Sequence, residues 1–237
     1  MPDMCALIEI RKEIKKYSST EKAKIYARFF KTGKCEYAEG DKFVGLTVPE
    51  SRMIAKKFSV LKFKEIDELF KSKIHEERLI ALLILVENFK KSDKGARKKI
   101  FDYYINRTKY INNWDLVDLS SEKIVGAYLL DKKDRKILYA LAKSNDLWER
   151  RIAIVANYHF IKNKDFVDVV KISEMLLDDK QDLIHKATGW MLREAGKRDK
   201  SVLIAFLNKH YKKMPRTMLR YSIEKLNVSE KKFFLKK

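Results

Sequence analysis

The stretch "HEERLIALLILVENFKK", residues 75–91, indicates the fold class of this chain. Its apolar residues recur at the three- and four-residue intervals of an α-helix, and polar residues close both ends. Similar spacing recurs from "EKAKIYARFFK" at 21–31 to "RTMLRYSIEKLN" at 216–227. No segment shows a convincing two-residue alternation, which is the pattern of a half-buried strand. The sequence therefore predicts an all-α protein.

The helices are expected to form repeats. Glycine and proline are scarce, and Pro49 and Pro215 stand where helices are expected to begin. "TVPE" at 47–50 has the pattern of a capping box. Arg151 in "ERRIAIVAN" and Lys186 in "IHKATGWML" are 35 residues apart (186 − 151), and "ERLIALLIL" begins 72 residues before "ERRIAIVAN" (149 − 77). Helical-pair repeats have periods of roughly 34 to 47 residues and stack into curved arrays. We expect tandem antiparallel helical pairs in a single domain, residues 1–237.

The charge of the chain favours a polyanionic partner. There are 53 Lys and Arg residues against 33 Asp and Glu, a formal net charge of +20. Nucleic acid is the most frequent partner of such a chain, although a generally basic surface gives the same excess. Residues 197–237 carry 13 Lys and Arg and three acids, hence +10 (13 − 3). Apolar and aromatic residues interleave these charges at helical spacing, which predicts folded surface and not a loose tail.

Several classes of protein are disfavoured. The two cysteines form neither a CxxC pair nor a disulfide framework, so a reducing cytoplasm fits best. No signal peptide is recognisable, and the longest apolar run, at 79–86, is too short to span a bilayer. The four histidines lack HExxH spacing, and phosphate loops and GxSxG elbows are missing. We expect no metal and no cofactor, and chemistry that needs only a carboxylate, positive charge and aromatic surfaces.

The stretch "NNWDLVD", residues 112–118, contains a candidate carboxylate. Either asparagine can cap a helix that starts at Trp114. At 100° per residue, Asp118 lies about 40° from Trp114, so both flank the apolar face, while Asp115 lies about 100° away and is expected to face solvent. This geometry leaves Asp118 open as an ordinary acid in a first helical turn or a functional carboxylate. Trp114 and Trp190 are likewise open to two interpretations, as ordinary core aromatics or as residues of a functional site.

Taken together, "NNWDLVD", "WERRIAI" (148–154) and "KATGWMLRE" (186–194) resemble the AlkD-type alkylpurine DNA glycosylases. These form a DNA alkylation repair family built from HEAT-like helical repeats. The likeness runs from "KIYARFF" (24–30) through "VPESR" (48–52) to "PRTMLRYSIEKL" (215–226). Each motif alone is weak, but their order and spacing are specific. The resemblance implies a HEAT-like superhelix whose basic concave face grips duplex DNA, acting as a monomer.

The resemblance also implies roles for individual residues. Asp118 matches the catalytic aspartate, and Trp114 and Trp190 match two tryptophans that contact the lesion-bearing nucleotide. Arg151 matches an arginine near the acid and the DNA backbone, and Arg52 matches a backbone-contacting position. Further backbone contacts are expected from the basic residues Lys186, Arg193, Arg216 and Arg220.

One residue departs from the family pattern. Phe29 stands where the family often carries a tyrosine, so the ring that contacts the lesion nucleotide is kept and the hydroxyl is lost. That loss removes any hydrogen bond the tyrosine makes, and it would shift lesion preference without changing the core assignment.

The chemistry suits these residue types. Alkylation at N3 of adenine or N7 of guanine makes the base cationic, so it departs neutral without a general acid. A preorganised carboxylate stabilises the oxocarbenium-like sugar, and tryptophan faces attract cations. We therefore expect a monofunctional glycosylase that hydrolyses the N-glycosidic bond of N3- and N7-alkylated purines, such as 3-methyladenine and 7-methylguanine, in duplex DNA. The alternatives are a non-catalytic DNA binder that senses damage or junctions, and a helical-repeat scaffold to which the charge is incidental.

Overall fold

A computed structural model describes residues 4–236, and the chain separates into two compact units, 1–120 and 121–237. All the regular secondary structure among the described residues is helical. The sole strand-like contact there is an isolated parallel bridge between Lys42 and Ile74. The predicted all-α class is confirmed. The prediction of a single domain stays a prediction, because contact density does not decide whether two units fold independently.

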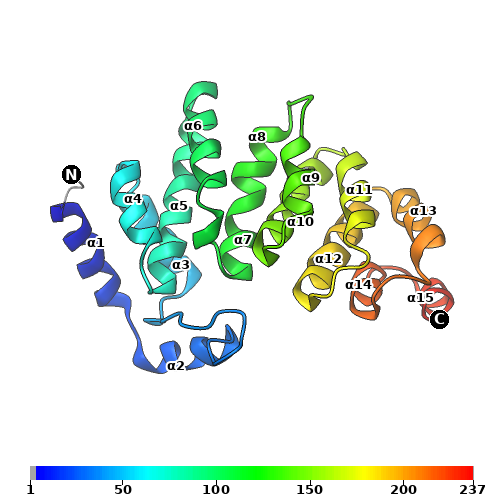
Figure 1. Cartoon of the computed structure of the whole chain (residues 1–237), viewed down its shortest axis with the longest axis horizontal. Helices are drawn as coiled ribbons and strands as arrows, with labels where there is room; N and C mark the ends of the chain where they lie inside the picture. Colours follow the sequence, from blue (N-terminus) through cyan, green and yellow to red (C-terminus); the bar gives the residue numbers. More distant parts are fainter. Residues whose placement is uncertain (1–3, 237) are drawn as a thin grey trace. The chain divides into compact units, whose positions relative to one another are not determined.

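The first unit is built around one helix, α5, which is buried over residues 75–86 (Figure 1). Its helices are α1 (Met4–Tyr17), α2 (Thr20–Phe29), α3 (Val48–Lys57), α4 (Phe63–Phe70), α5 (His75–Lys91), α6 (Lys94–Ile105) and α7 (Trp114–Ser121), with a 3-10 turn at Thr108–Tyr110. Helix α5 packs against α3, α4 and α6, and α1 packs against α3. A helix that is apolar all round must be buried all round, which explains the central place of α5.

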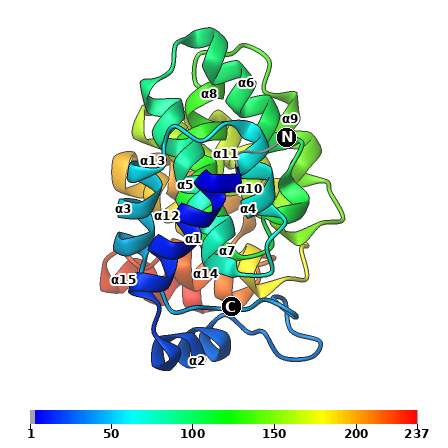
Figure 2. The same ribbon diagram turned by 90° about the vertical axis from the view of Figure 1, so that its left-hand side faces the viewer.

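Helix α2 and the loop that follows it lie at one end of the α3–α5 layer (Figures 1 and 2). Glu76, at the start of α5, holds this loop. Its buried carboxylate accepts the backbone N–H groups of Val44 at 3.1 Å, Gly45 at 2.8 Å and Leu46 at 3.2 Å. The loop is therefore fastened to the first turn of α5, although it contains almost no regular structure of its own.

The second unit is also a set of stacked helices. It contains a π-helical turn (Glu122–Gly126), α8 (Ala127–Leu129), α9 (Lys136–Ala142), α10 (Leu147–Lys162), α11 (Val167–Met175), α12 (Asp182–Arg198), α13 (Lys200–His210), α14 (Arg216–Ser222) and α15 (Val228–Leu235). Helix α10 packs against α9, α11 and α12, and α12 packs against α13 and α14. The last helices enclose an apolar core around Phe206, Met218 and Phe234, so the basic C-terminal stretch is folded, as predicted.

Local signals in the sequence mark the helix boundaries correctly. Thr47 and Glu50 form the expected capping box at the start of α3, where Pro49 occupies the first turn. Pro215 directly precedes α14. Only two residues connect α5 to α6, which forces the pair to run antiparallel.

The start positions of four helices show the repeat that the sequence predicts. α5, α7, α10 and α12 begin at residues 75, 114, 147 and 182, at intervals of 39, 33 and 35 residues (114 − 75, 147 − 114, 182 − 147). Such intervals are typical of helical-pair repeats, so tandem helical pairs are confirmed. Asp118, Arg151 and Lys186 are each the fifth residue of their helix, which gives them equivalent places in successive repeats.

Gly189 allows α12 and α14 to approach closely. A Cβ at Gly189 would lie 2.5 Å from the carbonyl oxygen of Met218 and 2.6 Å from the Cβ of Tyr221. We expect Gly189→Ala to lower the free energy of unfolding by about 1–3 kcal/mol, the usual cost of overpacking, although alanine is the better helix former. Urea unfolding followed by circular dichroism measures the change.

Gly95→Ala is the matched control, because a Cβ there meets only Asp93 Oδ1 at 3.4 Å, an ordinary contact. It should leave stability unchanged or raise it by up to about 1 kcal/mol. A Gly189→Ala protein as stable as the control would contradict the close packing of α12 on α14.

Candidate functional site

Helix α7 carries Trp114 and Asp118 and starts at the predicted residue. Asn113 is fully buried, and its Oδ1 accepts the backbone N–H of Trp114 at 2.8 Å. Its carbonyl accepts the N–H of Val117 at 3.3 Å. The side chain therefore satisfies one donor that a helix start leaves unpaired, and the carbonyl accepts the first intrahelical hydrogen bond. This fixes the first turn of α7 and the direction in which Trp114 leaves it.

Asp115 does not face solvent, so that prediction is wrong. Asp115 is only 6% exposed and His75 only 1% exposed. Asp115 Oδ2 lies 2.8 Å from His75 Nε2. The helical wheel placed Asp115 away from the apolar arc of α7. It could not show that the start of α5 covers that side of the helix.

His75 is the centre of a buried ionic cluster. Its Nδ1 lies 3.4 Å from Asp41 Oδ2. Arg78 donates to the same oxygen at 2.5 Å and to Asn112 Oδ1 at 3.1 Å, and Asn112 Nδ2 donates to Asp41 Oδ1 at 3.0 Å. We call these residues and Asp115 the His75 cluster. It joins the loop after α2, the first turn of α5 and the first turn of α7.

The cluster keeps His75 charged. Burial disfavours the imidazolium, but the negative charge of Asp115 and hydrogen bonds to Asp115 and Asp41 outweigh burial and raise the pKa of His75 to about 9. Burial likewise opposes ionisation of Asp41, but the hydrogen bond with His75 and the charge of Arg78 prevail and lower the pKa of that carboxyl. At neutral pH His75 and Asp41 are therefore both ionised.

A stack of rings runs from His75 to Trp114. The Phe43 ring stacks on His75 at 4.5 Å between centroids, Phe30 stacks on Phe43 at 5.0 Å, and Trp114 stacks on Phe30 at 5.1 Å. Phe29, which is 61% exposed, sets its edge against Trp114 at 5.8 Å. Phe29 and Trp114, proposed to contact the same nucleotide, are thus brought together.

A small cavity opens beside this stack, with a volume of about 170 Å³. Its lining is largely aromatic and apolar, and it includes His75 and Asp115 of the His75 cluster. The lining residues are Tyr26, Phe29, Phe30, Phe43, Leu46, Val48, His75, Glu76, Leu79 and Asp115. The charged groups that line it already hydrogen-bond to protein atoms. Phe29 is the most exposed ring of this lining.

Asp118 lies one turn after Trp114 and is half-buried, as is Trp114. Burial raises the pKa of Tyr104, a hydrogen bond with Ser120 lowers it, and the negative charge of Asp118 raises it further. The carboxylate is therefore close enough to the buried Tyr104 hydroxyl to act on it electrostatically. Tyr104 and Ser120 Oγ lie 3.0 Å apart, so the back of α7 is fixed against α6.

The second unit brings Arg151 and Trp190 to neighbouring helices, α10 and α12. Arg151 is only 5% exposed, and its Nη1 donates to the carbonyl of Leu183 at 2.5 Å. Trp190 is half-buried, and its ring centroid lies 5.8 Å from that of Tyr158. Neither Trp114 nor Trp190 is a fully buried core residue, which leaves part of each ring accessible.

The predicted backbone-contacting residues differ in how free their charge is. Arg193 is half-buried and pairs with both Glu224 and Glu194. Lys186 pairs with Asp182 at 2.7 Å. The remaining three are Arg52, half-buried on α3, and the exposed Arg216 and Arg220 on α14. Arg193 is therefore the member of this set whose charge is most nearly neutralised.

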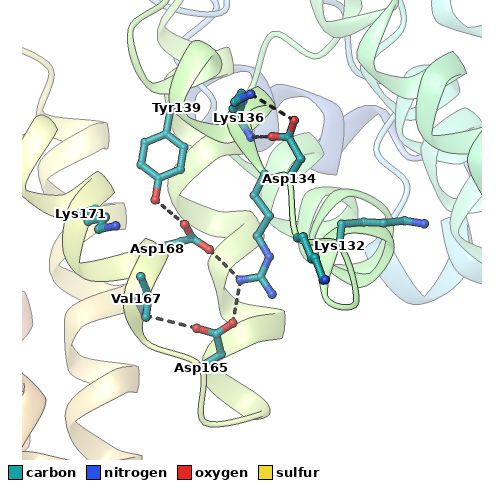
Figure 3. Close-up of a pocket in the computed structure, with 10 residues that line it drawn as sticks. Lys132, Asp134, Lys136, Tyr139, Asp165, Val167, Asp168 and Lys171 are labelled. Atoms are coloured by element: carbon teal, nitrogen blue, oxygen red, sulfur yellow. Dashed lines mark hydrogen bonds and ion pairs between the residues drawn. The ribbon is translucent and has the colours of Figure 1, made fainter.

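A larger cavity in the second unit, of about 670 Å³, is surrounded by lysines (Figure 3). Inside it the Arg135 guanidinium donates to Asp165 and Asp168, both at 2.7 Å, and the Tyr139 hydroxyl donates to Asp168. These hydrogen bonds engage Asp165 and Asp168, and the third carboxylate of the lining, Asp134, pairs with Lys136. Within residues 4–236, no group of three His, Cys, Asp or Glu side chains could hold a metal ion.

Sequence reasoning missed the His75 cluster because it examined histidines only for metal spacing. Its partner acids are 34 and 40 residues away, beyond any local motif. One signal was available. "HEER" at 75–78 places four consecutive polar residues at the start of an apolar helix, and all four are buried. Buried charges require partners elsewhere in the chain.

The raised pKa of His75 makes stability depend on pH. The folded-state pKa of about 9 exceeds the ordinary histidine pKa of 6.5, so the stabilising contribution is complete below about pH 6.5 and is lost as the pH rises through 9. The difference corresponds to about 3 kcal/mol. Urea unfolding of the wild type and His75→Gln between pH 6 and 10 should show this fall in the wild type alone. Equal pH slopes would contradict the assignment.

Comparisons with known proteins agree with the helical-repeat fold. A family model described as "DNA alkylation repair enzyme" matches residues 10–226. Among solved structures, "Predicted DNA alkylation repair enzyme from Enterococcus faecalis" is similar with a TM-score of 0.70 and 16% identity, covering 89% of this chain and 97% of that chain. This likeness concerns the fold. No curated protein sequence matches. No described helix is long and apolar enough to cross a membrane. The chain belongs to the DNA alkylation repair enzyme family, whose members act in the repair of alkylated DNA.

Proposed function

We propose that the protein is a monofunctional DNA glycosylase that hydrolyses the N-glycosidic bond of cationic N3- and N7-alkylated purines in duplex DNA. The observation that carries the proposal is the pairing of Asp118 with Trp114, both half-buried, one turn apart on α7. Family membership supplies the substrate class, alkylated DNA. The carboxylate and the aromatic face supply the chemistry.

Asp118 would act on the sugar and not on the base. An alkylated purine is already cationic and leaves as a neutral molecule, so positive charge develops on the deoxyribose as the bond breaks. A fixed carboxylate stabilises that charge and orients the water that completes hydrolysis. Half-burial strengthens this interaction, because Coulomb energies grow as the effective dielectric falls.

The aromatic residues would select cationic nucleotides. Trp114, with the exposed Phe29 at its edge, and Trp190 each offer ring surface, and such a face attracts a cation by about 0.5–2 kcal/mol. Tyr158 supports Trp190, and Lys162 and Arg198 lie over the Tyr158 ring at 4.9 Å and 5.5 Å. Phe29 contributes ring contact without a hydroxyl, so no hydrogen bond to the lesion is expected from it.

The basic residues would bind the phosphate backbone. Arg151 and Lys186 are each the fifth residue of their helices, α10 and α12, which pack together in the second unit. Exposed Arg216 and Arg220 add charge on α14. Two further expectations, a monomer and a cytoplasmic location, stay predictions.

Asp118→Asn tests the proposal directly. We expect the single-turnover rate of 7-methylguanine release from methylated duplex to fall by about 10²–10³, the usual cost of losing one preorganised electrostatic group. DNA affinity at fixed salt should change little, since the acid makes no backbone contact in this proposal. Chromatography of the released base gives the rate, and Asp178→Asn, an exposed acid elsewhere, is the control.

Equal rates for Asp118→Asn and the wild type would show that the acid has another role. If the wild type released neither 3-methyladenine nor 7-methylguanine, yet bound DNA, the non-catalytic DNA binder would be the better interpretation. Negligible affinity even at low salt would favour the protein scaffold.

Salt dependence separates the candidate DNA contacts. Arg220→Ala should reduce the slope of log K against log salt by about 0.9 if the side chain neutralises one phosphate. Arg193→Ala should change the slope less, because Glu224 and Glu194 already pair with this guanidinium. Fluorescence anisotropy titrations at several salt concentrations measure both slopes. Identical slopes for wild type and Arg220→Ala would remove Arg220 from the interface.

A further inference from the structure

We propose that His75 is a positioning residue for the reaction, orienting Trp114 and Asp118 by fixing the start of helix α7. This inference rests on the proposed glycosylase function. His75 lies on α5 and would touch neither DNA nor the reacting atoms, so it acts only through the residues that it holds.

The first connection is the hydrogen bond between His75 Nε2 and Asp115 Oδ2, at 2.8 Å. Asp115 directly follows Trp114 and lies three residues before Asp118. Both atoms of the contact are buried, so water does not compete for the bond. A shift of Asp115 would therefore rotate or translate the first turn of α7 together with both functional side chains.

The second connection is the ring stack. His75 stacks on Phe43 at 4.5 Å, Phe43 on Phe30 at 5.0 Å, and Phe30 on Trp114 at 5.1 Å. A charged imidazolium over an aromatic face gains cation–π attraction in addition to packing. The orientation of the Trp114 ring thus depends on His75 by a route that does not pass through Asp115.

Further contacts hold His75 itself in place. Its Nδ1 faces Asp41 Oδ2, and Asp41 is fixed by Arg78 and Asn112. Asn112 immediately precedes the capping residue of α7, so the helix start is held at residues 112 and 115. The charged groups around the imidazole are Asp41 from the loop, Asp115 from α7 and Arg78 from α5, while Glu76 beside it binds the loop backbone.

Both ring nitrogens can donate only in the imidazolium, because neutral imidazole has one N–H. Deprotonation therefore removes the imidazole hydrogen bond to one of the two buried carboxylates, and it removes the positive charge beside both. The raised pKa, about 9, places this change at alkaline pH. Below it both acids are satisfied and α7 is held. Above it the start of α7 loosens and the Trp114 ring loses its fixed support.

The indole N–H resonance of Trp114 reports this coupling without any enzymatic reaction. In the full-length protein it is assigned by its absence in Trp114→Phe. Between pH 7 and 10 the wild-type resonance should titrate with a midpoint near 9, the pKa of His75. His75→Gln should abolish that titration, and His210→Gln, which removes an imidazole paired with Glu174 elsewhere, should preserve it. A Trp114 resonance that titrates identically in His75→Gln overturns the inference.

Kinetics test the consequence for the reaction. At pH 7.5 the single-turnover base-release rate of His75→Gln should be about 10-fold or more below wild type, since small misplacement of catalytic groups is costly. DNA affinity should stay within about threefold, because the basic residues are untouched. The wild-type rate, corrected for spontaneous release, should fall as pH rises through 9, whereas the variant should lack this limb. A wild-type rate in His75→Gln overturns the inference.

Asp115→Asn keeps the inference testable if His75→Gln fails to fold. It keeps a hydrogen-bond acceptor beside Nε2 but removes the charge that most strongly raises the His75 pKa, so the Trp114 midpoint should move clearly below 9. An unchanged midpoint would count against the coupling. Failure of the proposed function has a different signature. The wild type would then release no alkylated base at any pH, while the indole titration would still answer for His75 and Trp114.

Discussion

The contact on which the rest of the site depends is the buried imidazolium of His75 between two carboxylates, Asp41 and Asp115. Three segments far apart in the sequence meet there: the loop after α2, the start of α5 and the start of α7. Buried ion pairs add little net stability compared with apolar packing of the same volume. However, separating the partners of a buried ion pair costs much free energy, because it leaves an uncompensated buried charge. The pair therefore fixes the positions of the segments that carry it. The cluster is thus suited to holding α7 in one register.

Where the sequence succeeded, the signal was local. Thr47 with Glu50, Asn113 before Trp114, and the apolar period of residues 75–91 each depend on neighbours within a turn or two. The helical wheel wrongly predicted that Asp115 faces solvent, because its partner lies far away in the sequence. The burial of Asp115 is imposed by His75, 40 residues earlier in the chain, and no helical wheel of α7 contains that residue.

The two acids of "NNWDLVD" illustrate how the structure sharpens a choice that the sequence alone left open. Asp115 already compensates a buried imidazolium at 2.8 Å, so its charge is not available to a cation arriving from solution. Asp118, half-buried and one turn from Trp114, is the acid on this helix that retains access to solvent. The surroundings of the two acids thus differ: Asp115 holds the first turn of α7 through His75, and the catalytic role of Asp118 stays a prediction.

A buried cation at the start of one helix recurs in the second unit. Arg151, in the second turn of α10, donates to the carbonyl of Leu183, the second residue of α12. His75 at the start of α5 contacts Asp115, the second residue of α7. In both cases a buried cation on one helix contacts the first turn of another helix. That second helix bears one of the two candidate tryptophans, Trp114 or Trp190. A buried guanidinium cannot steer DNA from a distance as Arg216 or Arg220 can. The hydrogen bond of Arg151 also holds the first turn of α12, and Trp190 lies two turns further along that helix.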